Sequence, residues 1–188
     1  MAEFYFNTDD VLNNIQNLNA GDRVFLSGIV YTARDAAHKR IRALIDTNSK
    51  IPFSMENSFI YYAGPTPTPD GMVIGSCGPT TSSRMDGFAP MFLDKGLKGM
   101  IGKGPRNRDV VDAIVRNNAI YFCAVGGAGA LASKCIVSCD VIAFDDLGCE
   151  SVKKLVFKEL FHKIWSFLRK TSINNQLKNK TAHPTVPR

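Results

Sequence analysis

A mostly apolar run at Val24–Tyr31, rich in β-branched and aromatic residues, most restricts how this chain can fold. Such a run is typical of a strand covered on both faces, as in layered α/β proteins. A helix is expected directly after it, over residues 34–46, with Thr32 or Asp35 placed to cap its start. The apolar residues that recur there at helical spacing are Ala36, Ala37, Ile41, Leu44 and Ile45. We therefore expect an α/β fold.

Similar patterns continue along the chain. Residues 1–20 have room for a short strand and a short helix. Further strands are expected over residues 59–63, 72–75, 99–102, 119–125 and 135–144. Further helices are expected over residues 83–95, 107–117 and about 150–169, and another begins at the glycine turn 126–130. A chain of 188 residues is one domain of ordinary size, which we place at residues 1–169. Residues 170–188 are rich in Asn, Lys and Thr, and we predict that they form a disordered basic tail.

The positive charge of the chain is concentrated at one end. The formal net charge is +6, yet residues 1–150 hold 14 Lys and Arg against 16 Asp and Glu. Residues 151–188 hold nine basic residues and one acid, Glu159. A solvated tail explains this better than a nucleic-acid site on the folded body. The sequence contains neither an apolar run of about 18 residues nor a basic, apolar leader, so we expect a cytoplasmic protein with no membrane partner.

Five cysteines are present, at positions 77, 123, 135, 139 and 149. An odd number in a chain of this kind argues against a disulfide framework. Cys135 and Cys139 have a spacing that invites a metal site, but they lie in a β-branched stretch where buried thiols are the more ordinary interpretation. Because no C-x-x-C pair occurs, we expect no metal site and no iron–sulfur cluster built by this chain alone.

The segment Gly75–Gly87 has the most distinctive local sequence. A Gly-Pro turn is followed by four hydroxyl residues, so Thr80 or Thr81 is placed to cap a helix. A helix start presents unpaired N–H groups and a positive dipole end, and Arg84 adds a planar fork of donors. These features predict a carboxylate or phosphate site. An ordinary capped helix has the same pattern, so the residues alone leave both interpretations open.

Three basic residues follow predicted strands: Arg34, Arg84 and Lys103. Strand ends are where ligands bind in layered α/β folds, so these cations would converge at one end of the sheet. Arginine suits a carboxylate through its paired donors, and lysine supplies a point charge. Each alone would usually form a surface ion pair. Around a hydroxyl-rich turn, the three together favour a carboxylate site. The glycine turn at 126–130 lacks dinucleotide-binding spacing and favours close packing.

The sequence G-P-T-T-S-x-R-M-D at residues 78–86 resembles the signature of a known family. That family is the β subunit, or C-terminal domain, of class I iron–sulfur hydro-lyases, which include class I fumarate hydratase and L-tartrate dehydratase. Further agreement, in the same order and within about residues 20–150, is found at Gly21-Asp22 with Leu26-Ser27-Gly28, Tyr31–Arg40, Tyr61–Pro65, Ile101–Gly104, and Gly126–Ala128 with Ala130.

The resemblance implies roles for particular residues. The residues implied to bind substrate are Arg34, Arg84 and Lys103. Thr80 matches the proposed catalytic base, and its hydroxyl is a weak base unless nearby cations or an Asp tune it. The residues expected beside the site are Asp35, His38, Thr81 and Asp86. His38 is the conventional base candidate, because it follows Arg34 by one helical turn. Packing of His38 in the core or at an interface is the alternative.

The resemblance also implies an architecture. It predicts a swivelling β/β/α domain with a layered mixed sheet and flanking helices. In this family, a [4Fe–4S] cluster is bound by the α subunit, so we expect an α-subunit partner in an assembly such as α2β2. After the acid matching Glu150, the family continues with one more apolar strand. Here Phe157–Trp165 reads as helical, so we predict that this strand is missing.

The expected function is that of a fumarate hydratase β subunit, active only with its α subunit on a small dicarboxylate. An L-tartrate dehydratase β subunit is the close alternative, because both substrates are four-carbon diacids. A carboxylate-binding module without catalysis is the alternative from another class of protein.

Overall fold

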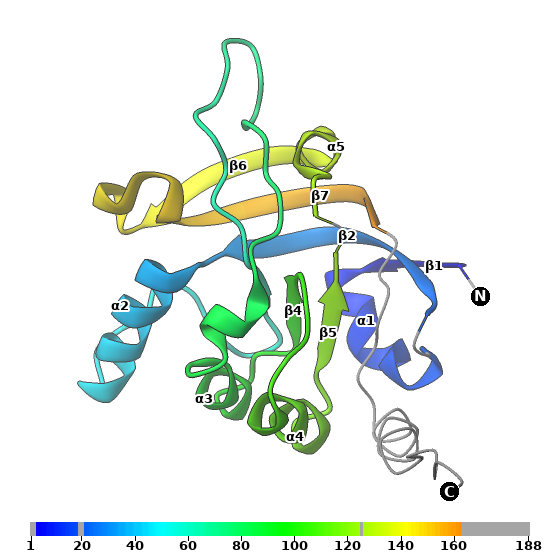
Figure 1. The fold of residues 1–188 in the computed structure, drawn as a ribbon, viewed down its shortest axis with the longest axis vertical. Helices are drawn as coiled ribbons and strands as arrows, with labels where there is room; N and C mark the ends of the chain where they lie inside the picture. The colour runs from blue at the N-terminus through cyan, green and yellow to red at the C-terminus, as the bar shows by residue number, and fades with distance from the viewer. Residues whose placement is uncertain (1–2, 19–20, 125, 163–188) are drawn as a thin grey trace, which may run out of the picture.

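The computed structural model describes residues 3–18, 21–124 and 126–162, and β2 (Arg23–Thr32) is the central strand of its mixed sheet (Figure 1). The described residues form a seven-stranded sheet in the order β5-β4-β3-β2-β7-β6, with β1 also paired to β2. The strands that run parallel to one another are β1 (Glu3–Asn7), β2, β3 (Phe59–Tyr61), β4 (Gly99–Gly102) and β5 (Ile120–Cys123). The antiparallel strands are β6 (Ile136–Ala143) and β7 (Val152–His162). The predicted α/β fold with a layered mixed sheet is therefore confirmed.

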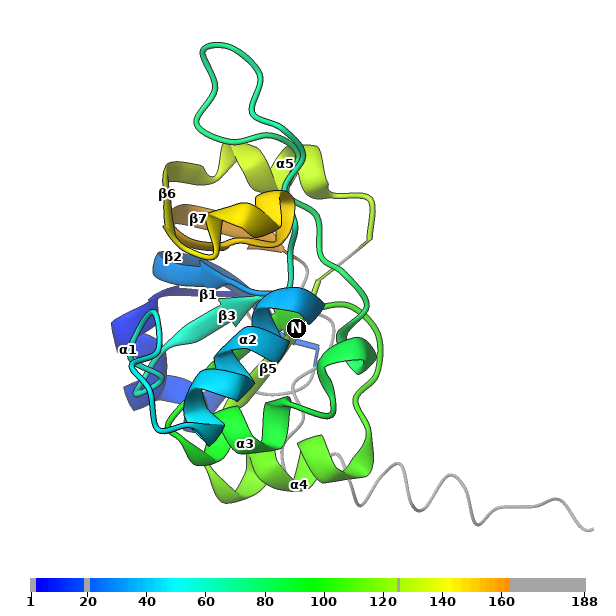
Figure 2. The same cartoon turned by 90° about the vertical axis from the view of Figure 1, so that its left-hand side faces the viewer.

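Helices lie on both sides of this sheet. The α-helices are α1 (Thr8–Asn14), α2 (Asp35–Asp46), α3 (Ala89–Asp94), α4 (Arg108–Arg116) and α5 (Gly129–Lys134). The short 3-10 segments are η1 (Ile15–Asn17), η2 (Ser82–Met85) and η3 (Asp145–Glu150). Figure 2 shows α2, α3 and α4 together on one side of the short parallel strands, whereas α5 lies beside β6 and β7. Among the described residues, no helix combines the length and apolar character needed to cross a membrane.

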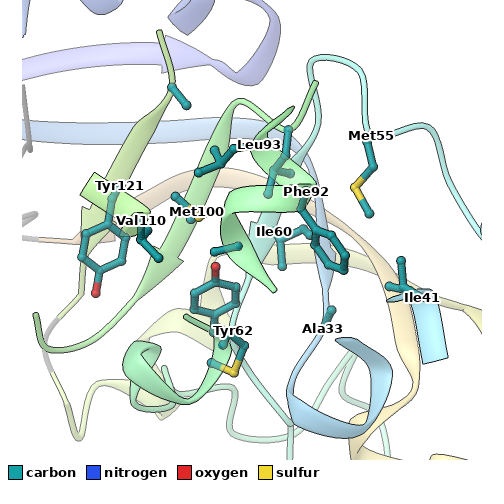
Figure 3. Packing of buried hydrophobic residues seen from close by; sticks show 14 of the residues in the cluster. Ala33, Ile41, Met55, Ile60, Tyr62, Phe92, Leu93, Met100, Val110 and Tyr121 are labelled. Atoms are coloured by element: carbon teal, nitrogen blue, oxygen red, sulfur yellow. The ribbon is translucent and has the colours of Figure 1, made fainter. Parts of the chain in front are cut away.

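Two hydrophobic clusters, one on each face of the sheet, form the core. Alternate residues of β3 divide between them, because successive strand side chains point to opposite faces. Phe59 and Tyr61 join the cluster that includes residues of α5 and β7. Ile60 and Tyr62 join the cluster under α2, α3 and α4, which is shown in Figure 3. The positions after β3 are therefore held by packing on both faces.

The prediction of a helix over residues 150–169, and of a missing last strand, is wrong. Val152–His162 is β7, which pairs antiparallel with both β2 and β6. Its side chains divide between the faces, since Val152 enters the cluster under α2 while Leu155 and Phe157 enter the other. The local pattern indicates a helix because it contains no information about β2 and β6, the two strands that pair with this segment. Residues 163–169 and the predicted tail at 170–188 lie outside the described residues.

Two other elements differ from prediction. Residues 72–75 belong to a projecting loop rather than a strand, and this loop extends past α5 in both views (Figures 1 and 2). A Cβ atom on Gly75 would lie 2.4 Å from the Thr66 carbonyl oxygen, so the two sides of the loop approach closely there. The helix predicted over residues 83–95 is divided into η2 and α3. Pro90, in the first turn of α3, has no N–H to continue a preceding helix.

Thr32 joins the ends of β2 and β7, and removing its hydroxyl should destabilise the protein. Its Oγ1 donates to the Ser151 carbonyl at 3.3 Å and accepts from the Lys153 N–H at 3.0 Å, in a buried setting. We expect Thr32→Val to lower the free energy of unfolding by about 1–3 kcal/mol, because the Lys153 N–H loses its acceptor. Urea unfolding measures the loss. Thr47→Val, which removes an exposed hydroxyl, should stay within about 0.5 kcal/mol. An equal loss in both variants would contradict this role of Thr32.

Candidate carboxylate-binding site

The carboxyl ends of β2, β3 and β4 meet at one edge of the sheet, because these strands are parallel. Arg34 follows β2 and precedes α2, while Lys103 follows β4 directly. Tyr62 and Gly64 follow β3 and lie between them in the strand order. The structure therefore brings Arg34 and Lys103 to a common edge. The prediction that Arg84 also follows a strand is wrong, because residues 72–75 form a loop and Arg84 lies in η2.

The loop that carries Thr80 is attached to this edge through its backbone. The Thr80 N–H donates to the Tyr62 carbonyl at 2.7 Å, and the Thr80 carbonyl accepts from the Lys103 N–H at 3.2 Å. Ser82 N–H then donates to the Lys103 carbonyl at 2.9 Å. Thr80 is half-buried, and its hydroxyl has no hydrogen bond among the described residues. The loop thus fixes the Thr80 backbone on both sides and leaves its hydroxyl available.

Thr81 stands at the N-cap of η2, but its side chain makes no capping hydrogen bond. The prediction that a threonine hydroxyl caps this helix is therefore not met at Thr81. Thr81 is exposed and its backbone forms a parallel bridge with Lys103. Thr32 and Asp35 do not cap α2 either. The N-cap residue of α2 is Arg34, and the Arg34 side chain makes no capping hydrogen bond.

The glycine turn before α5 packs against the same loop. Cys77 N–H donates to the Gly129 carbonyl at 3.1 Å, and a Cβ atom on Gly129 would lie 2.9 Å from the backbone nitrogen of Gly78. A larger residue at 129 would therefore push the loop away from the sheet edge. The Lys103 side chain extends towards Gly126, where a Cβ atom would lie 3.8 Å from Nζ. The turn is therefore closely packed against the loop, as the sequence predicts.

Two arginines and two carboxylates form a chain of ion pairs at the start of α2. Arg84 Nε donates to Asp35 Oδ1 at 2.8 Å, and Asp35 Oδ2 lies 3.8 Å from Arg34 Nε. Arg34 Nη2 lies 3.4 Å from Glu150 Oε1. Arg34, Asp35 and Glu150 are about a fifth to a quarter exposed, and Arg84 is half exposed. The contribution of Glu150 could not be read from its sequence position, 114 residues from the helix start that it contacts.

The charge balance of this edge favours an anion. Three cations and two carboxylates leave one net positive charge, and Lys103 has no ion pair among the described residues. Arg34 Nε and Asp35 Oδ2 are buried atoms without a hydrogen-bond partner in the described part of the chain. The hydrogen bonds of Arg84 to described residues engage Nε alone, which leaves its terminal nitrogens for a ligand. Guanidinium groups so placed suit the paired oxygens of a carboxylate.

His38 lies beneath the site in the core, with no exposed surface. Its ring stacks on Phe92 at a centroid distance of 5.0 Å and meets the edge of Tyr62 at 5.4 Å. Nδ1 is 2.9 Å from the Arg34 carbonyl, which accepts hydrogen bonds only, so Nδ1 carries the proton there. Nε2 is buried without a partner among the described residues. Burial lowers the pKa of His38 to about 4. Of the two positions considered for His38, the structure shows packing in the core rather than a place on the surface of the site.

Asp86 supports the loop from below. Its carboxylate accepts from Arg106 Nε at 2.7 Å and from the Asn107 N–H at 2.8 Å. The Arg106 side chain is fully buried and lies over the rings of Tyr62 and Tyr121, at 5.2 and 5.1 Å. Sequence reasoning missed Arg106, although its place after the Lys103-Gly104-Pro105 turn was a signal. Asp86 therefore stabilises the segment that follows Arg84.

The cysteines do not gather into a metal site within the described residues, where no group of three or more potential ligands occurs. Cys77 is buried, and burial raises the pKa of its thiol to about 12. Cys135 and Cys139 are half-buried on and beside β6, and Cys149 is exposed. The described donor set therefore does not fit an iron–sulfur cluster.

Asp86→Asn should strongly destabilise the protein, because it leaves the buried charge of Arg106 without its partner. We expect a loss of about 3–5 kcal/mol in the free energy of unfolding. The matched control is Asp112→Asn, which removes an exposed pair with Arg108 one turn away on α4 and should change stability by under about 0.5 kcal/mol. Chemical denaturation of both variants makes the comparison. A loss below 1 kcal/mol in Asp86→Asn would show that the buried pair is dispensable.

Stability should fall as the pH drops from about 6.5 to about 4, because His38 takes up its proton more readily in the unfolded chain. With these two pKa values, the folded protein should lose about 2 kcal/mol between pH 7 and pH 5 through this residue. His38→Phe keeps an aromatic ring beside Phe92 and should remove that part of the acid sensitivity. Unfolding curves at both pH values measure it. An unchanged pH dependence in the variant would contradict this assignment.

Comparison with known proteins places this arrangement in a family. Residues 2–165 match the model of the Fumarase C-terminus family. The chain is 38% identical over 149 residues to fumarate hydratase 2 of Leishmania major, covering 78% of this chain and 26% of that protein. It is 34% identical over 148 residues to the anaerobic class I fumarate hydratase of Escherichia coli K12, covering 78% and 27%.

A third relative is similar in extent to this chain. The chain is 35% identical over 139 residues to a candidate L(+)-tartrate dehydratase subunit beta of Methanocaldococcus jannaschii, covering 72% of this chain and 71% of that protein. By contrast, the chain spans about a quarter of the length of the fumarate hydratases that it matches. The family match and these identities confirm the resemblance carried by residues 78–86, and the chain belongs to the Fumarase C-terminus family.

Proposed function

We propose that this chain is the β-type component of a two-chain hydro-lyase, and that the assembled enzyme hydrates fumarate reversibly to L-malate. Two observations support the proposal: the chain of ion pairs that joins Arg84 to Arg34 through Asp35, and the backbone bonds that join the Thr80 loop to Lys103 at the sheet edge. Family membership supports the same reaction class, because relatives of this chain are named as fumarate hydratases and a tartrate dehydratase subunit.

In this proposal, the cations hold a dicarboxylate by its two ends. Arg84 and Arg34 are joined through Asp35, which fixes the direction of Arg84 while its terminal nitrogens stay available. Lys103 adds a charge that no carboxylate neutralises among the described residues. A dianion would therefore meet a positive edge with oriented donors, and binding both carboxylates would fix the carbon chain between them.

Thr80 is proposed to exchange the proton on the carbon next to one carboxylate. Its backbone is held between Tyr62 and Lys103, and in this proposal its hydroxyl faces the substrate held by the cations. A threonine hydroxyl needs an environment that stabilises its deprotonated form, and nearby positive charge has that effect. The same cations would stabilise the negative charge that develops on the substrate carboxylate when the proton leaves.

The departure of the hydroxyl group needs a Lewis acid, and the described residues of this chain contain no ligand set for one. We therefore propose that an α-subunit partner holds the [4Fe–4S] cluster and completes the site, in an assembly such as α2β2. The relative named as a subunit beta supports a two-chain arrangement. The exposed position of Arg84 and Thr81 is compatible with a site closed by a second protein surface.

Co-expression with a cluster-bearing partner under anaerobic conditions, followed by assays with fumarate and L-tartrate, tests the proposal. Turnover of fumarate would support it, and preferential turnover of tartrate would favour the dehydratase alternative suggested by the archaeal relative. A complex that binds dicarboxylates and turns over neither would instead identify a carboxylate-binding module. The isolated chain should be colourless and inactive, and a stoichiometric cluster in it would overturn the proposed division of labour.

Thr80→Val should separate chemistry from stability in the assembled enzyme. Because the Thr80 hydroxyl has no hydrogen bond among the described residues, stability should change by under about 0.5 kcal/mol. If Thr80 carries the proton, kcat should fall by on the order of 10²-fold or more. Thr68→Val, in the exposed projecting loop, is the control and should keep native kcat. Near-native kcat in a stable Thr80→Val enzyme would remove Thr80 from the catalytic role.

A further inference from the structure

The register of β2 and β7 brings Glu150 to the helix start that contains Arg34. Thr32 pairs with Lys153, and Tyr31 pairs with Lys154, in antiparallel order. The chain leaves β2 towards Arg34 and enters β7 from Glu150, so both residues lie at the same end of this ladder. Their proximity is therefore imposed by the backbone pairing of two long strands.

Glu150 makes two contacts with this helix start. Its Oε2 accepts from the Ala36 N–H at 3.0 Å, and its Oε1 lies 3.4 Å from Arg34 Nη2. The Ala36 N–H is one of the donors that a helix start leaves without an internal partner. Since the N-cap residue Arg34 supplies no capping side chain, this carboxylate provides the cap from another part of the chain. One acid thus binds both the helix start and the guanidinium.

Gly64 and Asp35 enclose the rest of the Arg34 side chain. A Cβ atom on Gly64 would lie 2.8 Å from Arg34 Nη1 and 2.9 Å from its Cδ, so the side chain passes directly over this glycine. Asp35 Oδ2 is 3.8 Å from Arg34 Nε, too far for a hydrogen bond. Among the described residues, Glu150 is therefore the closest carboxylate to Arg34.

A second ion pair joins the same two elements and provides an internal comparison. Asp146, also in η3, accepts from both terminal nitrogens of Arg40, further along α2, with Nη1 to Oδ1 at 2.7 Å. These side chains are 64% and 41% exposed, and the pair involves none of the candidate site residues. Docking of η3 against α2 therefore has a contact that does not depend on Glu150.

We propose that Glu150 is a positioning residue that holds the Arg34 guanidinium in place to receive one carboxylate of the substrate. This inference rests on the proposed function, in which Arg34 binds that carboxylate. A free arginine side chain loses rotamer entropy when it is ordered by a ligand. Glu150 and Gly64 order the Arg34 side chain before the substrate binds, so ordering it subtracts less from the free energy of substrate binding.

The experiment compares Glu150→Gln with Asp146→Asn in the full chain assembled with its partner. Glu150→Gln keeps the size of the side chain and an oxygen that accepts from Ala36 N–H, but removes the charge that faces Arg34. We expect kcat/KM for the dicarboxylate to fall about tenfold in Glu150→Gln and to stay within about twofold in Asp146→Asn. Both melting temperatures should stay within a few degrees of the native value. In an Arg34→Lys background, Glu150→Gln should change kcat/KM by less than about twofold, because the two changes act through one group.

Three kinetic results would overturn the proposal: native kcat/KM in Glu150→Gln, a decreased KM, or an equal loss in the Arg34→Lys background. The second would show that Glu150 competes with substrate for Arg34, and the third that the effect of Glu150 does not pass through Arg34. Side-chain ¹⁵N relaxation of Arg34 Nε in the full chain gives a measurement that needs no turnover. Its order should fall in Glu150→Gln and persist in Asp146→Asn. Unchanged order in Glu150→Gln rejects the positioning role even in an active enzyme. Reduced order with an enzyme inactive on both substrates supports that role and counts against the proposed function.

Discussion

The pairing of β2 on both of its edges is the interaction on which the rest of the structure depends. One edge bonds to β1 and β3 in parallel, and the other bonds to β7 in antiparallel order. The parallel neighbours direct the ends of β2, β3 and β4 to one side of the molecule, while β6 returns the chain to that same side, where β7 begins. Thr32 links the ends of β2 and β7 through its buried hydroxyl. The site edge therefore combines residues from the start, the middle and the end of the described chain.

The charged groups around this edge form one buried ion pair and one partly exposed chain of ion pairs. Arg106 and Asp86 are buried, where an ion pair is costly to desolvate and very costly to break, so they fix one local geometry. Arg34, Asp35, Arg84 and Glu150 are partly exposed, where each pair contributes little to stability. These pairs act by orientation, because they direct the N–H donors of the two arginines to one place without occupying every guanidinium nitrogen. The buried pair supports the loop, and the partly exposed chain of pairs prepares the surface for an anion.

Most elements could be predicted because their sequence patterns are local. The apolar run of β2 and the amphipathic pattern of α2 indicate these elements from the residues of each segment alone. β7 could not be predicted, because its residues take strand conformation where β2 and β6 supply hydrogen-bonding partners on both edges. The pairing of Asp86, which follows η2, with Arg106 likewise joins residues 20 positions apart.

The sequence by itself determined the α/β class, the family, and the strand-end positions of Arg34 and Lys103. These follow from local periodicity and from short motifs, which are properties of neighbouring residues. The tertiary structure alone decided that Glu150 meets Arg34, that Asp86 pairs with Arg106, and that His38 faces an aromatic core. Each of these depends on strand register and on packing between distant segments. Such contacts stabilise the protein only once the whole sheet has assembled, so no local pattern in the chain encodes them.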